Sequence, residues 1–76
     1  MSPRLPRISG KDLMGVLLRH GFSLVHVRGS HHYLEPPCGG RLVTIPVHAG
    51  KLLKPKTLKS IIDQAEITVE ELIELL

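Results

Sequence analysis

The chain contains a single cysteine, Cys38, among its 76 residues. One cysteine cannot form an internal disulfide and supplies too few thiolates for a structural zinc cluster, and these are the two usual supports of very small folds. The chain is also too short for two domains. We therefore expect one small domain that is held together by the packing of a single hydrophobic core.

The N-terminal segment and the distribution of apolar residues indicate the cell compartment. No stretch approaches the roughly 20 consecutive apolar residues that a membrane helix needs, and the N-terminus carries charge and proline without the apolar core of a secretion signal. We therefore expect a cytoplasmic protein with no membrane partner. Residues 1–8 hold prolines and arginines without periodicity, which predicts a flexible basic arm ahead of a single domain over residues 9–76.

The net charge of +3 conceals an uneven distribution. All ten Lys and Arg lie in residues 1–59, where Asp12 and Glu35 are the only acids, so this part carries +8. Residues 60–76 hold five acids and no base, and carry −5. A basic body of this kind favours an anionic partner such as nucleic acid, and the acidic segment is expected to lie away from the surface that binds it.

Helix signals occur at both ends of the chain. Asp12 and Glu71 each follow a Ser or Thr by three residues, as in the capping box that starts many helices. The predicted helices are residues 10–20 after Ser9 with Gly21 as the stop, a second helix that begins at Pro55, and a short third helix after Thr68.

Three segments rich in β-forming residues lie between the first two helices: residues 22–28, 31–35 and 41–47. Gly29-Ser30 is a two-residue turn between the first two, and residues 36–40 form a Pro- and Gly-rich loop before the third. Together with the helices, this order predicts an α+β fold, a two-layer α-β-β-β-α sandwich with an extra short C-terminal helix. The helices should cover one sheet face and leave the other open.

The histidines differ in what their positions allow. His20 ends the first helix, where a cationic ring meets the negative end of the helix dipole, so a structural role is expected. His31 and His32 are adjacent in a strand and must point to opposite faces. Only one of them can lie on the open face, and the strand pattern does not choose between them. The histidine spacing suggests no metal site, and no cofactor is expected.

The residues around this histidine pair suit a phosphate. Gly29 allows close approach of a phosphate to the backbone, Ser30 offers a hydroxyl, and Arg28 and the lysines of residues 51–59 supply positive charge, although the lysines could equally be a solvated helix edge. Imidazole can take a proton from a ribose 2′-hydroxyl near neutral pH, so RNA would supply its own nucleophile.

Base stacking is poorly supported by the composition. Phe22 and Tyr33 are the only aromatic residues besides histidine, and Phe22 is expected in the core. Recognition through phosphates and 2′-hydroxyls, with weak sequence selectivity, is the expected mode of RNA binding.

Four segments, in this order and spacing, resemble the HicA family of bacterial toxins over roughly residues 9–67. They are residues 13–22, the Val-Arg-Gly-Ser-His-His-Tyr run at 27–33, the Val-Thr-Ile-Pro-Val-His run at 43–48, and residues 52–61. The resemblance implies a fold like the double-stranded-RNA-binding domain. It also implies a metal-independent endoribonuclease that acts on mRNA, an mRNA interferase, inhibited by a HicB-type antitoxin.

The resemblance also implies roles for individual residues. His31, which follows the Gly-Ser pair, matches the catalytic histidine and would act as general base; Gly29 is also needed, and Ser30 and His32 have weaker claims. His48 matches a recurrent position after the third strand, where it could assist the reaction or order the loop. The residues expected to bind RNA are Arg28, Gly29, Ser30, His32, His48, Lys51 and Lys54. The alternative function is a non-catalytic RNA-binding module of the same fold.

Overall fold

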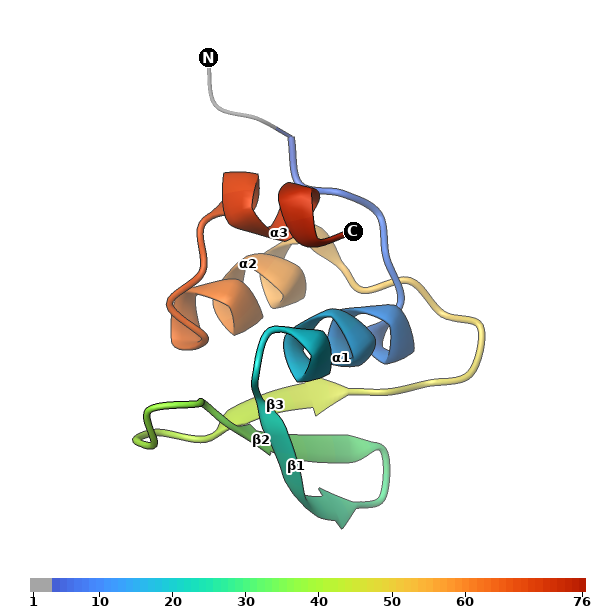
Figure 1. Cartoon of the computed structure of the whole chain (residues 1–76). Coiled ribbons are helices and arrows are strands. Elements are labelled where there is room, and N and C mark those ends of the chain that lie inside the picture. The colour runs from blue at the N-terminus through green and yellow to red at the C-terminus, as the bar shows by residue number, and fades with distance from the viewer. Residues whose placement is uncertain (1–3) are drawn as a thin grey trace.

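The structure is a computed structural model, and it describes residues 4–76. Its elements are α1 (Gly10–Arg19), β1 (Ser23–Arg28), β2 (His31–Glu35), β3 (Val43–Pro46), α2 (Pro55–Gln64) and α3 (Val69–Leu75). The strands form one antiparallel sheet in the order β1-β2-β3, and the helices lie on one side of it (Figure 1). This arrangement confirms the predicted two-layer α+β fold with an extra C-terminal helix and an open sheet face.

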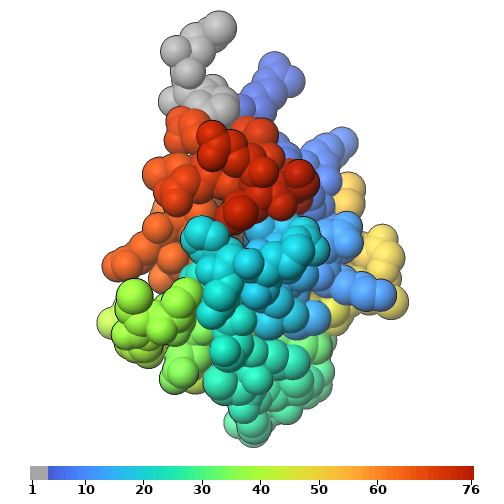
Figure 2. All heavy atoms as spheres, viewed as in Figure 1, coloured from blue at the N-terminus to red at the C-terminus, as the bar shows by residue number. Residues whose placement is uncertain are grey.

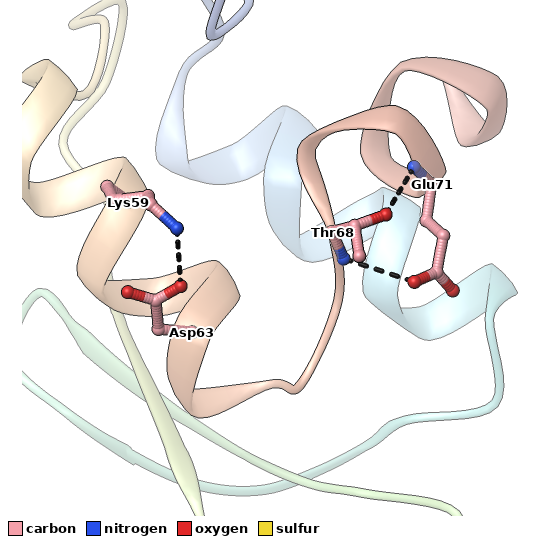
Figure 3. A network of polar contacts seen from close by, with 4 residues as sticks. All are labelled: Lys59, Asp63, Thr68 and Glu71. Carbon is pink, nitrogen blue, oxygen red and sulfur yellow. Dashed lines mark hydrogen bonds and ion pairs between the residues drawn. The ribbon is translucent and has the colours of Figure 1, made fainter. Parts of the chain in front are cut away.

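Local signals define where each helix begins. The Ser9 hydroxyl accepts a hydrogen bond from the backbone N–H of Asp12 at 3.1 Å. Thr68 and Glu71 form a complete capping box, in which each side chain accepts a bond from the other's backbone N–H at 3.1 Å (Figure 3). α2 begins with Pro55, whose missing N–H costs nothing in the first turn. The three helices therefore start where the sequence predicts.

The Gly29-Ser30 turn sets the pairing of β1 with β2. Gly29 has a φ of 60°, and a positive φ at the first position of a two-residue turn is the requirement of a type II′ hairpin. Arg28 consequently pairs with His31, and the register continues regularly for two more pairs before a β-bulge between Leu24 and His26. The bulge shifts the first half of β1 by one residue relative to β2.

β3 is shorter than predicted, because the sequence suggests residues 41–47 and the strand spans Val43–Pro46. β2 offers partners only from His31 to Leu34, which pair with Pro46 and Val43 at the two ends of the ladder. Beyond these pairs, residue 47 faces the turn and residues 41–42 follow the Pro- and Gly-rich loop. β3 therefore ends opposite the first residue of β2 at Pro46, and at Val43 it ends one residue short of Glu35, which pairs with β1.

The core lies between the sheet and the helices. Leu34, Val43 and Ile45 point from β2 and β3 toward the helices and are fully buried. The remaining buried side chains, mostly aliphatic, are Ile8, Leu13, Val16, Leu17, Phe22, Leu58, Ile61, Ile62, Ile67 and Leu72. Phe22 is thus a core residue, as predicted, and the helices rest on β3 rather than on β1.

β1 is left exposed by this packing. Leu24, Val25 and Val27 retain 43%, 49% and 48% of their exposure, because the helices do not extend over this edge of the sheet. Figure 2 shows β1 on the surface along the front of the molecule.

The segment before α1 is packed at its C-terminal end. Ile8 is buried, and its carbonyl accepts a hydrogen bond from the N–H of Leu53 at 2.8 Å, while Ser9 forms a β-bridge with Leu52. Ile8 therefore belongs to the core, although the sequence places it in the basic arm. The pattern is misleading there because Leu5 and Ile8, separated by a proline and an arginine, are too few to show a periodicity. Residues 1–3 of the predicted arm lie outside the described residues.

α3 lies on the far side of the other helices from the sheet (Figure 1). It carries Glu70, Glu71 and Glu74. α3 thus lies away from the open sheet face, as expected, whereas Asp63 of the same acidic segment is 2.7 Å from Lys59 of the basic run. Within residues 4–76, no helix has the length and apolar character needed to span a bilayer.

Candidate nucleic-acid interface at one end of the sheet

The two adjacent histidines of β2 point to opposite faces of the sheet. His32 lies on the same face as the buried Leu34, is half-buried, and places its Nδ1 3.2 Å from the Ser30 carbonyl oxygen. His31 is exposed on the open face. The strand argument that only one of the pair can reach a ligand on the open face is confirmed, and His31 is that residue.

The neighbours of His31 are a cation and a proline. Arg28 on β1 and Pro46 on β3 are its cross-strand partners, so the three residues form one row across the open face. Directly opposite residues in antiparallel strands have Cβ atoms about 4.5–5.5 Å apart, which puts the guanidinium within reach of a group bound at the imidazole. A phosphate at His31 would therefore meet a positive charge.

A second row lies two residues further along β2. His26, Tyr33 and Thr44 are paired across the three strands, and the rings of His26 and Tyr33 are 5.4 Å apart at an angle of 42°. The His26–Tyr33 pair was not among the residues expected to contact RNA. The signal for it is present in the sequence, because a two-residue turn at 29–30 places residue 26 opposite residue 33.

The loop after β3 brings further cations to the same end of the sheet. Val47 donates a backbone hydrogen bond to the Ser30 carbonyl at 2.7 Å, which ties the loop to the β1–β2 turn. Both lie at the same end of the sheet in Figure 1, and the loop projects at the edge of the molecule in Figure 2. A pocket of about 340 Å³ is lined by Pro46, the cross-strand partner of His31 on β3, and by His48, Lys51 and Lys54.

The structure thus gathers most of the predicted RNA-binding residues. Gly29 is exposed in the turn, with open space where a side chain would begin, and Ser30 beside it is half-buried. His32 is not part of this group, because its ring turns to the helix side. The residues gathered at this end are Arg28, Gly29, Ser30, His31, His48, Lys51 and Lys54.

The other lysines of the basic run lie elsewhere. Lys56 and Lys59 line a larger pocket of about 700 Å³ with Arg41 and Leu5, on the other side of α2's first turns. The Lys59 ammonium is 2.7 Å from the Asp63 carboxylate one helical turn away, and both side chains are exposed (Figure 3). The lysines of residues 51–59 are therefore divided between two surfaces. Lys51 and Lys54 lie beside Pro46, the cross-strand partner of His31, whereas Lys56 and Lys59 do not.

Within the part of the chain that the structure describes, no three His, Cys, Asp or Glu side chains are grouped so that they could hold a metal ion. Cys38 is exposed in the loop that joins β2 to β3, at the opposite end of β2 from His31. The ionisable groups gathered at the His31 end of the sheet are imidazole, guanidinium and ammonium groups.

A family model described as the HicA toxin of bacterial toxin–antitoxin systems matches residues 10–67. The chain belongs to the HicA toxin family. The match covers more than half of the chain, so this HicA-family protein is the toxin of a toxin–antitoxin pair and has an antitoxin as its partner. A comparison with the curated proteins finds no match.

The matched region of this HicA-family chain contains the whole candidate interface. It runs from the start of α1 through the sheet and α2, and ends before the capping box of α3. α3 therefore lies outside the matched region, and it contributes Leu72 to the core.

Proposed function

We propose that this HicA-family chain is an endoribonuclease that cleaves mRNA without a metal ion. The observation that carries the proposal is the position of His31, which is exposed on the open sheet face, beside Arg28 and at the end of the sheet where the loop lysines gather. Membership in a toxin family supports the same conclusion.

In the proposed reaction, the His31 imidazole takes the proton of a ribose 2′-hydroxyl. The 2′ oxygen attacks the adjacent phosphorus, and the bond from phosphorus to the 5′ oxygen breaks. Arg28 stabilises the negative charge that develops on the phosphoryl oxygens, while Lys51 and Lys54 hold the neighbouring backbone. The products are a 2′,3′-cyclic phosphate and a 5′-hydroxyl.

The leaving 5′ oxygen needs a proton. His48 and Lys51 lie together in the pocket that begins at Pro46, and either of them or a water molecule can supply it. A site with a well-placed base and a less defined acid should turn over modestly.

We further propose that the antitoxin is of the HicB type and inhibits the enzyme by covering the His31 face. That face is basic, and the acids of α3 lie away from it (Figure 1). A partner that presents acidic side chains to Arg28 and the loop lysines would exclude RNA and gain electrostatic complementarity.

The test compares wild-type protein with His31→Ala on a reporter mRNA, with cleavage sites mapped by primer extension. Loss of a general base should lower the rate by about 10²- to 10⁴-fold. His20→Ala is the matched control, since His20 is equally an exposed histidine but caps α1 and lies outside the site. Cleavage by wild-type protein should persist in excess EDTA.

Cleavage that survives His31→Ala would remove the mechanism. If wild-type protein binds RNA with a steep salt dependence and leaves it intact, the chain is the non-catalytic RNA-binding module instead.

A further inference from the structure

Tyr33 occupies a distinctive place on the open face. It lies two residues after His31 on β2 and points to the same side, so the two positions are about 6.6 Å apart along the strand. Its ring contacts that of His26 on β1, and its neighbour on β3 is the smaller Thr44. An aromatic pair therefore stands directly beside the row that holds His31 and Arg28.

The pair is anchored and accessible at the same time. Tyr33 is half-buried within the sheet and His26 is exposed. The ring of Tyr33 is thus positioned by two strands, and little side-chain freedom remains to be lost when a flat ligand lies on it. The helices of residues 4–76 all lie on the other side of the sheet (Figure 1).

The charge on the open face changes along β2. Glu35 is the only acidic residue in the three strands; it shares the open face with His31 and Tyr33, and it lies at the end of β2 opposite to His31, where it pairs with Ser23. On the His31 side, Arg28 faces the same surface. A ligand that joins a flat ring to a phosphate would place the ring on the His26–Tyr33 pair and the phosphate at His31 and Arg28.

We infer that the His26–Tyr33 pair stacks on an unpaired nucleobase next to the phosphate held at His31, so that the substrate is single-stranded RNA. The inference rests on the proposed function and names its substrate class. Base stacking on aromatic side chains requires a base whose face is free, whereas both faces of a base inside a duplex are covered by its neighbours. The expectation from composition, that phosphates and 2′-hydroxyls alone are recognised, did not include this pair.

The protein contains its own probe for this contact. Tyr33 is the only tyrosine and the chain has no tryptophan, so the intrinsic fluorescence reports on Tyr33 alone. His31→Ala protein is titrated with a short single-stranded oligoribonucleotide, and separately with the same strand annealed to its complement. Saturable quenching by the single strand, and weaker quenching at equal concentrations of duplex, are expected.

Variants in the His31→Ala background separate stacking from general binding. Tyr33→Leu should weaken binding of the single strand by at least about fivefold, and Tyr33→Phe should change it by less than about twofold. Val27→Ala is the matched control, because Val27 is exposed on β1 but points to the other face, and it should bind like the parent. His26→Ala removes an exposed ring without opening the core, and it should also weaken binding of the single strand. It provides the test if Tyr33→Leu fails to fold.

The outcomes distinguish the two proposals. Unchanged affinity of a folded Tyr33→Leu or His26→Ala protein, or equal quenching by the duplex, would overturn the stacking inference while His31-dependent cleavage still stood. Cleavage that persists in His31→Ala would instead refute the proposed reaction, whatever the binding by Tyr33.

Discussion

The same substitution at two glycines of α1 should change stability in opposite directions. Gly10 is the first residue of the helix and is buried against the end of β3, and a Cβ at this position would overlap the Pro46 carbonyl oxygen. Gly15 lies in the middle of the helix, and the nearest atom to its Cβ would be the flexible guanidinium of Arg19 at 3.6 Å. The space available to one methyl group therefore differs at the two sites.

The magnitudes follow from two opposing effects. Replacing glycine by alanine inside a helix gains up to about 1 kcal/mol. Gly15→Ala receives this gain without a clash, and its melting temperature should rise by about 4–8 °C. At Gly10, insertion of a methyl group against rigid backbone costs about 1–3 kcal/mol, and the first helical position recovers less of the helix gain, so a net loss of about 1–2 kcal/mol is expected.

The assay is thermal and urea unfolding followed by far-ultraviolet circular dichroism. Both variants are made in the His31→Ala background, because the exposed His31 contributes little to packing and its removal should abolish the proposed cleavage, which would otherwise limit expression. A neutral or stabilising Gly10→Ala, or a Gly15→Ala that destabilises as much as Gly10→Ala, would refute the argument that close packing of α1 on β3 requires glycine.

Three further substitutions test local features. Gly29→Ala should destabilise by about 1–2 kcal/mol because of the positive φ, whereas Gly29→Asn should cost less, and a melting curve that ranks them the other way would contradict a backbone origin. Thr68→Ala should cost about 1 kcal/mol through loss of the N-cap bond to Glu71, measured by urea unfolding against Thr68→Ser, which retains it. A double-mutant cycle on Lys59 and Asp63 should give a coupling of about 0.5 kcal/mol or less that disappears at high salt, since both side chains are exposed; a larger, salt-insensitive value would argue against solvent screening.

Much of the fold could be predicted because its signals are local. The Gly29-Ser30 turn, the proline that starts α2 and the capping box of Thr68 each act within a few residues of the chain. The bulge in β1 could not be predicted. The turn sets the pairing of the residues next to it, but the shift between Leu24 and His26 depends on how the more distant part of β1 packs on β2. The burial of Ile8 likewise depends on Leu53, which is distant in sequence.

The candidate site shows the same division. Alternation along a strand places His31 and His32 on opposite faces, but only the packing of the helices decides which face is open. The separation of Lys51 and Lys54 from Lys59 depends on the path of the loop before α2, which no local pattern specifies.

The one-sided packing of the helices has a consequence for how this toxin can vary. Residues that point from β2 and β3 into the core, such as Leu34 and Ile45, cannot change without loss of the fold, whereas Arg28 and His31 are exposed on the opposite face and contribute little to it. A bacterial population under pressure to escape the toxin should therefore accumulate two kinds of inactive allele, which alternate along β2 and β3. One kind yields no soluble protein, and the other yields a folded chain whose open face is altered.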